Sequence, residues 1–505
     1  MKAVLISPIK NVTAANFRGL GAALAAAGHD VVQVFLPDVA AEGGRVLGRE
    51  FPYETPYPAS LVADVATACA GAGLVGVSLM TNHFERAADL TARLRPMVRA
   101  PIIWGGIHPT VRPEECLEYA DAVALGEADE TLLDFVGRLG RGDEWRRTPG
   151  FYARDGGDVV RNPITPPPAD LGALPLPLYQ PAKDLIQDRE AGRLVPLTDE
   201  LLARYTDLIS PHANAGVAGS LYMANASRGC QHACSFCSNA FLKKLHGGYK
   251  GTRWRPAAHV LAELAQVRRR WPFVKYVFFS DDELLAMPDP IFDEFADRYA
   301  AEVGLPFRCF TSADTVSRER LARVVPAGFF LAEVGIQSAA AATQKSFRRQ
   351  WLGDERILAA VRVMNEFAPA LVPTYDLIVD NPYETTAERL ATLRFVTRLP
   401  RPFFLQAFSL TFYPGTDLYE RARADGLITD DRRQVYRKNS LAVERRDYIH
   451  ILTTLNNRAV PRALIRAAAW RPFVWLATHA PGSWAFAAAA ALARAAARLL
   501  RGGKG

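Results

Sequence analysis

Short apolar runs alternate with helical stretches over the first 140 of the 505 residues. Runs such as 3–6, 31–35 and 74–79 are apolar at nearly every position, not only at every second one. Strands of this kind are buried on both faces, and single helices between them give a parallel sheet with helices on both sides. We therefore predict an α/β chain that begins with a doubly wound, Rossmann-like domain at residues 1–140.

Ligands of such sheets bind beyond the carboxyl ends of the strands. Four loops lie at that edge, and each is expected to contact a ligand: Lys10-Asn11, Met80–His83, Gly105–Thr110 and Gly126-Glu127. The pair Gly105-Gly106 would let the main chain approach a bulky ligand closely, because glycine has no side chain. A plain tight turn is the alternative for Gly126-Glu127.

Residues 141–218 are rich in proline and are predicted to form a stiff linker, with a small hairpin at 151–160. The alternation then resumes with a longer period at residues 219–428. Six strand–helix units indicate a partial (β/α)6 barrel of the TIM type, with functional groups at the carboxyl ends of the strands. The predicted strands are 221–226, 276–279, 307–311, 331–336, 374–379 and 404–410.

The C-terminal region, 429–505, is rich in Arg and Ala and is predicted to be helical, with a helix at 484–500. Its uncharged apolar stretch, 484–493, is shorter than the roughly 20 residues of a membrane span. We expect this helix to pack on the barrel. The alternative is a helix on a membrane surface, with aromatic side chains inserted and three arginines at the headgroups: Trp484, Phe486, Arg494, Arg498 and Arg501.

Six cysteines in 505 residues are too few for a disulfide-stapled secreted protein. The N-terminal apolar run is too short for a signal peptide, so we expect a cytoplasmic protein. The net charge of +7 comes from scattered arginines interleaved with acids. This pattern does not favour nucleic-acid binding.

Three of the cysteines, Cys230, Cys234 and Cys237, lie within eight positions of one another, directly after a predicted strand. Three thiolates at this spacing can hold three corners of a cubane iron–sulfur cluster and leave the fourth iron open to a small molecule. The alternative is a zinc site with His232 or His246 as the fourth ligand. Zinc sites usually contain a second cysteine pair, which this chain lacks.

The spacing Cys230-x3-Cys234-x-Phe236-Cys237 resembles the signature of radical S-adenosylmethionine enzymes. Four later segments resemble the family's pattern in its order: 280–283, 335–338, 380–385 and 413–416. Gln337 stands where the family usually has an acid. The resemblance implies that Cys230, Cys234 and Cys237 ligate a [4Fe-4S] cluster, that Phe236 packs on the adenine of S-adenosylmethionine, that Asp281 and Asp282 lie near its amino group, and that Gly335, Gln337 and Ser338 lie near its ribose.

Residues 105–110, 113–115 and 124–131 resemble the cobalamin-binding domain of one branch of that superfamily. The resemblance implies cobalamin contacts at Gly105, Gly106, His108, Gly126 and Glu127. The Asp-x-His-x-x-Gly pattern that supplies a lower cobalt ligand in other cobalamin proteins is absent. We therefore expect no protein histidine on cobalt, and expect His83 and His108 to be core or rim residues.

Together the two resemblances cover residues 1 to about 425. They imply an enzyme that uses a 5'-deoxyadenosyl radical and methylcobalamin to methylate an unactivated carbon of a biosynthetic intermediate. The alternatives are oxidative cyclisation or ring rearrangement with the same cofactors, or a non-catalytic cobalamin and redox sensor. A methylthiotransferase is disfavoured, because Cys69 and Cys116 cannot form a second cysteine triad.

The expected partners are a small-molecule or lipid substrate and an electron donor such as flavodoxin or ferredoxin. Peripheral membrane contact through the C-terminal helix would place the enzyme at a membrane surface. No motif identifies the substrate.

Overall fold

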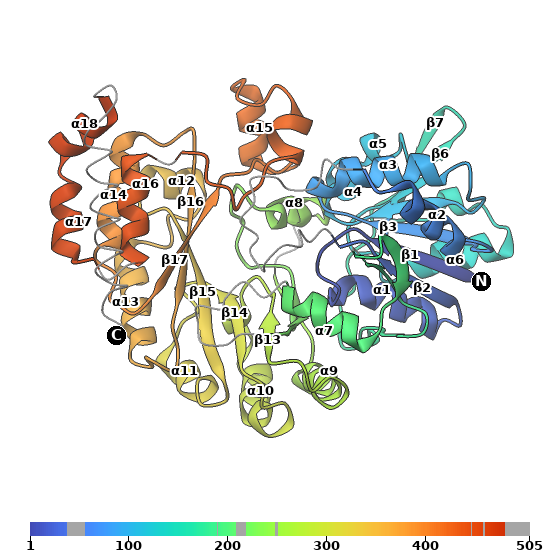
Figure 1. Cartoon of the computed structure of the whole chain (residues 1–505), viewed down its shortest axis with the longest axis horizontal. Helices are drawn as coiled ribbons and strands as arrows, with labels where there is room; N and C mark the ends of the chain where they lie inside the picture. The colour runs from blue at the N-terminus through green and yellow to red at the C-terminus, as the bar shows by residue number, and fades with distance from the viewer. Residues whose placement is uncertain are drawn as a thin grey trace. The chain divides into compact units, whose positions relative to one another are not determined.

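The computed structural model describes residues 1–37, 56–188, 190–208, 219–247, 251–445, 447–457 and 460–479. The helix predicted at 484–500 lies outside these residues. The chain forms two compact units (Figure 1). The first unit contains residues 1–307 and 411–438, and the second contains residues 308–410 and 439–505. These units divide the chain differently from the four predicted domains, which remain a division by sequence.

The N-terminal part of the first unit is a nine-stranded sheet in the order β7-β6-β5-β4-β3-β1-β2-β8-β9. Its central strands are parallel, and their apolar side chains are almost fully buried, as the sequence predicted. The strand order changes direction between β1 and β3, since β2 lies on one side of β1 and β3 to β5 lie on the other. The central strands are β1 (Lys2–Ser7), β2 (Asp30–Phe35), β3 (Leu74–Ser78), β4 (Ile102–Gly105) and β5 (Ala122–Ala124).

Helices cover both faces of this sheet (Figure 1). On one face α1 (Ala15–Ala26) contacts α6 (Thr131–Arg141). On the other face lie α2 (Ala59–Ala68), α3 (Phe84–Leu94), α4 (Ile107–Val111) and α5 (Pro113–Cys116). The α3 helix ends at Leu94, two residues before Pro96, which has no N–H to continue the helical hydrogen bonds.

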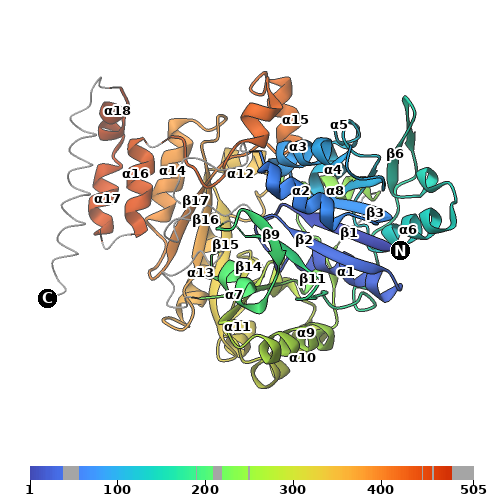
Figure 2. The same ribbon diagram turned by 45° about the vertical axis from the view of Figure 1, so that its right-hand side comes forward.

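The predicted linker contributes four strands to the sheet, which differs from the expected connector. The hairpin predicted at 151–160 is confirmed as β6 (Phe151–Asp155) and β7 (Asp158–Arg161), paired with β5. A second hairpin, β8 (Leu185–Asp188) and β9 (Arg193–Pro196), pairs with β2 at the other edge (Figure 2). The buried ion pair of Arg18 and Asp184, 2.8 Å long, holds this hairpin in place, and no local sequence pattern predicts it.

The first unit continues with α7 (Asp199–Leu208) and the parallel strands β10 (Leu221–Ala224) and β13 (Tyr276–Phe279). Between these strands, β11 (Ser227–Arg228) pairs with β12 (Arg253–Trp254). The helices are α8 (Ser238–Leu245), α9 (Ala257–Arg270) and α10 (Asp289–Glu302). Residues 411–438, here called the returning segment, contain α15 (Asp417–Ala424) and a π-helical turn at Arg432–Tyr436. They rejoin the first unit after the chain has passed through the second.

The second unit contains the parallel strands β15 (Phe329–Gln337), β16 (Thr374–Val379) and β17 (Phe404–Ser409), preceded by β14 (Phe307–Thr311). All six predicted barrel strands are present and alternate with helices, as expected for (β/α)6 units. The helices of the unit are α11 (Arg318–Val324), α12 (Ala341–Ser346), α13 (Asp354–Asn365), α14 (Thr386–Val396), α16 (Tyr448–Thr454), α17 (Arg462–Ala468) and α18 (Arg471–His479).

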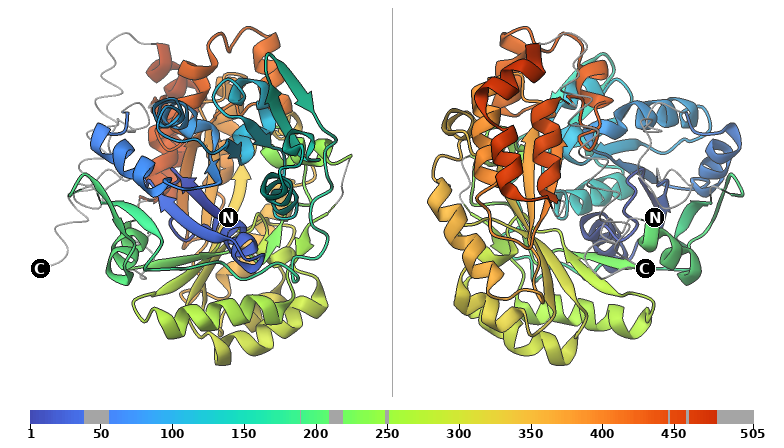
Figure 3. Two further views of the ribbon diagram at one scale, coloured as in Figure 1. Left: turned by 90° about the vertical axis from the view of Figure 1, so that its right-hand side faces the viewer. Right: turned by 60° about the vertical axis from the view of Figure 1, so that its left-hand side comes forward.

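The C-terminal helices, drawn in red in Figure 3, form a small core of their own with α14. Leu390 and Leu393 of α14 pack with Tyr448 and Ile449 of α16 and with Val474 of α18. No helix within the described ranges is both long enough and apolar enough to cross a membrane.

Candidate active site

A cavity of about 410 Å³ lies within the first unit. One wall comes from the carboxyl-end region of the N-terminal sheet, including Ser78, Gly105-Gly106 and Gly126-Glu127. The opposite wall comes from residues that follow β10 and β13, including Cys230 and Asp282. The cavity therefore lies beside the point where the strand order of the sheet changes direction, which is where doubly wound sheets bind ligands.

Two glycines bring main chain to the cavity wall. Gly106 has a φ of +105°, and a Cβ there would lie 2.5 Å from the carbonyl oxygen of Leu79. Gly126 has a φ of +74°, and a Cβ there would lie 2.9 Å from the His246 ring. Neither position accepts a side chain without a shift of its neighbours, so the wall is bare backbone at both.

Thr110 ties the two glycine loops together. Its hydroxyl donates to the carbonyl oxygen of Gly106 at 2.8 Å and accepts from the N–H of Gly126 at 3.0 Å. Thr110 stands in the segment that the sequence singled out, but no role was predicted for it. A signal was available, because a threonine four residues after a glycine in a short helix can bond back to its carbonyl.

The cysteine loop runs from β11 to α8, and Cys237 is the residue before that helix. The N–H of Cys237 donates to the carbonyl oxygen of Cys234 at 3.1 Å, and the N–H of His232 donates to Cys230 Sγ at 3.4 Å. Burial raises the pKa of Cys237 to about 11, and charge repulsion from Asp282 and Cys234 adds to the effect. Burial, with repulsion from Glu283, Asp282 and Cys237, also raises the pKa of Cys230.

The three thiols are thus electrostatic neighbours in one loop, which suits a shared cationic centre that would favour their thiolate forms. Phe236, in the same loop, is half-buried and is not among the residues that line the cavity. The other three cysteines, Cys69, Cys116 and Cys309, are buried.

Two arginines connect the cysteine loop to the N-terminal sheet. Arg228 and Arg253 are direct partners in the β11–β12 pair. Arg228 donates to Asp129 at 2.6 and 3.1 Å and to Glu127 at 2.9 Å. Arg253 also donates to both carboxylate oxygens of Glu127. Glu127 is predicted to contact the cofactor and does line the cavity, but its carboxylate is paired with these two arginines.

The acidic residues after β13 have different environments. Asp281 is buried and accepts hydrogen bonds from the N–H of Ala226, at 3.0 Å, and from the Ser227 hydroxyl. Burial raises the pKa of Asp281 to about 6, against the effect of these hydrogen bonds. Asp282 is exposed and lines the cavity, and Glu283 accepts from Gln231 at 2.8 Å. Asp281 thus fixes the start of the cysteine loop, and Asp282 is the acid that faces the open space.

His108, predicted to contact the cofactor, lies outside the cavity lining and is fully buried. Its ring packs against Phe84 and Tyr436, with ring centroids 4.9 Å away in each case. Burial lowers the pKa of His108, and likewise that of buried His83, to about 3. The neutral ring fits a packed aromatic cluster, so the core interpretation of these histidines agrees with the structure and the cofactor contact does not.

The histidine that does line the cavity is His246, at the end of α8. From the sequence, His246 is expected only as an alternative zinc ligand. Burial lowers its pKa, with repulsion from Arg253 adding to the shift. Its place beside Gly126 arises from long-range packing, which no local pattern predicts.

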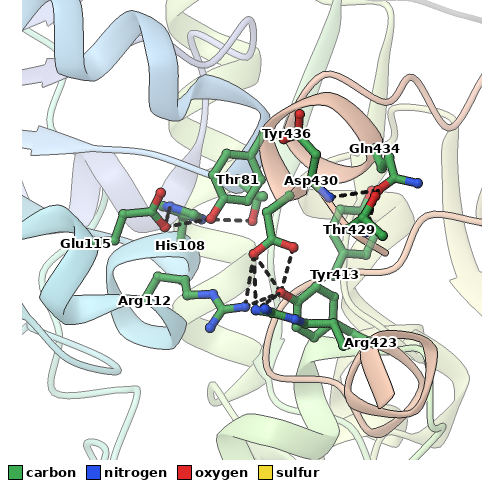
Figure 4. Close-up of polar contacts among 12 residues, drawn as sticks. Thr81, His108, Arg112, Glu115, Tyr413, Arg423, Thr429, Asp430, Gln434 and Tyr436 are labelled. Carbon is green, nitrogen blue, oxygen red and sulfur yellow. Dashed lines mark hydrogen bonds and ion pairs between the residues drawn. The ribbon is translucent and has the colours of Figure 1, made fainter. Parts of the chain in front are cut away.

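The returning segment contacts both walls of the cavity region. Tyr436 donates to Glu115 at 2.6 Å (Figure 4), and Arg112 lies 3.5 Å from Asp431. On the other side, the N–H of Leu418 donates to the carbonyl oxygen of Ser235 in the cysteine loop at 2.9 Å. A Cβ at Gly415 would lie 2.8 Å from the Phe241 ring and 3.1 Å from Val111. The turn at 413–416 thus fits between α8 and α4 without a side chain at Gly415.

The residues predicted near the ribose belong to the second unit, at the end of β15. Gln337 has a φ of +65°, and Gly335 accepts from Arg349 at 2.8 Å through its carbonyl oxygen. Ser338 donates to Glu384 at 2.9 Å, and Glu384 also accepts from Thr343 at 2.8 Å. The segment 380–385, whose sequence resembles the family pattern, therefore contacts the end of β15 through Glu384.

Comparison with protein families gives two matches. The model described as the radical SAM superfamily matches residues 224–396, and that described as the B12 binding domain matches residues 1–136. A comparison with curated proteins found no match.

Several solved structures share the fold. The radical S-adenosylmethionine methyltransferase TsrM from Kitasatospora setae, with tryptophan substrate and a SAM analogue bound, aligns with a TM-score of 0.63 at 16% identity, over 85% of this chain and 77% of that one. The same enzyme with cobalamin and a [4Fe-4S] cluster bound aligns with a TM-score of 0.61 at 16% identity, over 84% and 75% of the two chains. The cobalamin-dependent radical enzyme OxsB, with aqua-cobalamin and S-adenosylmethionine bound, gives 0.58 at 15% identity, over 84% of this chain and 55% of that one. At these identities the likeness shows the fold: an N-terminal B12-binding fold followed by a radical SAM fold.

Proposed function

We propose that this chain, a member of the radical SAM superfamily with a B12 binding domain at its N-terminus, methylates an unactivated carbon of a biosynthetic intermediate. The observation that carries the proposal is the cavity of about 410 Å³, whose opposite walls are the glycine loops of the N-terminal domain and the cysteine loop. Two cofactors that must act on one substrate need binding sites that open into the same space.

The residues present fit both cofactors. The cysteine loop contains three thiols and no fourth cysteine. This set suits a cluster with one open iron, held by Cys230, Cys234 and Cys237. The bare backbone at Gly105, Gly106 and Gly126 suits a flat, bulky ring that lies against main chain.

When bound, the cluster with S-adenosylmethionine would supply a carbon-centred radical, and cobalamin would supply the methyl group. The protein's own groups would bind and orient. Asp282, exposed to the cavity, offers a carboxylate to the amino group of S-adenosylmethionine. Asp281 and Arg228 would hold the cysteine loop in place, through Ser227 and Asp129 respectively.

In the second unit we assign the ribose contacts to Gly335, Gln337 and Ser338, and the adenine contact to Phe236 of the cysteine loop. Gln337 differs from the acid that is usual in the family, but its side-chain oxygen can still accept from a ribose hydroxyl. That oxygen has no hydrogen-bond partner among the described residues. We assign the electron supply to a flavodoxin or ferredoxin, and the substrate to a small molecule or a lipid.

Product stoichiometry tests the proposal. Methyl transfer to a carbon radical consumes two molecules of S-adenosylmethionine, one to restore the methyl donor and one to form the radical. With its substrate, the enzyme should release 5'-deoxyadenosine and S-adenosylhomocysteine in about equal amounts, with the labelled methyl group in the product. Deoxyadenosine without matching S-adenosylhomocysteine would indicate a cyclase or ring-rearranging enzyme instead. A reduced holoprotein that never cleaves S-adenosylmethionine would indicate a sensor.

A further inference from the structure

The C-terminal helices α17 and α18 expose large apolar side chains. Leu464, Trp470, Phe473 and Trp475 are 63, 59, 51 and 62% exposed. Of the ten exposed large apolar side chains in the described ranges, these four fall within twelve consecutive positions. The rings of Trp470 and Phe473 are in edge contact, with centroids 5.5 Å apart, so they form one patch.

The α18 helix is apolar on its outward as well as its inward side. Val474 is buried and packs with Tyr448 and Ile449, so it marks the inward side. At 100° per residue, Phe473 and Trp475 flank that direction on either side, and both are exposed. A helix with apolar side chains all round is normally covered on all sides. The described residues do not cover the outward side of this one.

The charged side chains of the same region are all positive. From Tyr448 to Gly505 the sequence contains seven arginines and one lysine and no Asp or Glu. Because the whole chain carries +7, the preceding residues sum to about zero. Arg462 and Arg466 use donors on carbonyl oxygens of Leu399 and Thr397, and Arg471 at the start of α18 is exposed.

We propose that α17 and α18 dock on an anionic lipid surface. Trp470, Phe473 and Trp475 would enter the interfacial layer, where aromatic rings are favoured, and Arg471 would contact lipid phosphates. The nine described residues of α18 are too few to span a bilayer, so the proposed contact is peripheral. This inference stands apart from the proposed reaction, because neither cofactor nor catalysis enters it.

Residues 480–505 are the other occupant to weigh. They add three arginines and one lysine and no acid. Packed over α18, they would bring those cations towards Arg471 without any counter-charge. A lipid surface supplies both the apolar cover and the anions, and we therefore favour it.

Vesicle co-sedimentation of the full-length protein tests the proposal. We expect binding to vesicles of phosphatidylcholine mixed with phosphatidylglycerol, and at least about tenfold weaker binding to phosphatidylcholine alone. The triple variant Trp470→Ser, Phe473→Ser, Trp475→Ser should bind the anionic vesicles at least about tenfold less. The control Met97→Ser removes a 50% exposed apolar side chain from the first unit and should change nothing. Circular dichroism checks that both variants are folded.

Three outcomes would overturn the proposal. The first is wild-type protein that does not co-sediment with anionic vesicles. The second is a triple variant that binds these vesicles as tightly as wild type. A third is binding that appears only after residues 480–505 are deleted, since the segment would then be the cover. A dimer that the triple variant abolishes, without any vesicle binding, would identify a second copy as the partner.

Discussion

Arg228, at the start of the cysteine loop, donates hydrogen bonds from both terminal nitrogens to the Asp129 carboxylate of the N-terminal domain, at 2.6 and 3.1 Å. The Asp129 side chain is 5% exposed, so its charge would be costly to leave unpaired. The pairing with Asp129, and that with Glu127, raises the pKa of Arg228 despite its burial. This contact fixes the cysteine loop against the sheet that carries the glycine loops.

Arg228→Met should therefore destabilise the protein by about 3 kcal/mol, because it leaves the buried Asp129 without its partner. Urea unfolding of the apoprotein measures the change. Arg138→Met is the matched control, since Arg138 pairs with Asp134 on an exposed helix face, and it should cost no more than about 0.5 kcal/mol. If the two variants lost equal amounts of unfolding free energy, the Arg228–Asp129 contact would not stabilise the protein as we predict.

Gly106→Ala should abolish cobalamin binding. The new Cβ would meet the Leu79 carbonyl oxygen at 2.5 Å, so the loop would have to move. Gly142→Ala is the control, because Gly142 also has a positive φ, +74°, but no atom within 4 Å of an added Cβ. The control should lose about 1 kcal/mol of stability and keep its cobalamin. Absorbance of cobalamin retained through gel filtration reports the result, and normal loading of Gly106→Ala would refute the assignment of this wall.

Acid should destabilise the first unit through its buried histidines. The pKa of His108 is about 3 in the folded protein, below the 6.5 of an exposed histidine. Below pH 6.5 the unfolded chain takes up a proton that the folded chain cannot, so stability is full above that pH and falls as the pH drops towards 3. At pH 5 this costs about 2 kcal/mol for each such histidine.

Replacement of His108 should remove the part of the acid-induced loss of unfolding free energy that comes from this histidine. Between pH 7.5 and pH 5, His108→Gln should lose about 2 kcal/mol less unfolding free energy than wild type, as measured by urea titrations at both pH values. Because Asp281 and Glu115 titrate alike in both proteins, the comparison isolates His108. Its contact with Glu115, 3.9 Å, is not an ion pair in this range, since the ring is neutral. Parallel pH profiles for the two proteins would show the prediction to be wrong.

Much of the fold could be predicted because its strands are predominantly apolar and alternate with helical stretches. The strands at 276–279, 307–311 and 374–379 match the structure residue for residue. The hairpin of β8 and β9 was missed, because the bond that docks it, Arg18 to Asp184, joins residues 166 positions apart. Local periodicity contains no trace of such a pair.

The candidate site divides in the same way. The cysteine spacing and the glycine loops are local patterns, and the sequence identified both. His246 and the returning segment reach the site only through tertiary packing. His108 was assigned to the cofactor from its neighbours in sequence, whereas its short helix buries it between Phe84 and Tyr436. A residue next to a ligand loop along the chain need not face the ligand.

The most direct test of the account is reductive cleavage of S-adenosylmethionine by the reconstituted protein and by Cys234→Ala. Both proteins are loaded with iron, sulfide and cobalamin, reduced, and given methyl-labelled S-adenosylmethionine. We predict that the wild type releases 5'-deoxyadenosine and contains four irons per chain. Cys234→Ala should release none and lose the cluster, while it still binds cobalamin. Full iron content and undiminished deoxyadenosine formation in Cys234→Ala would contradict the account.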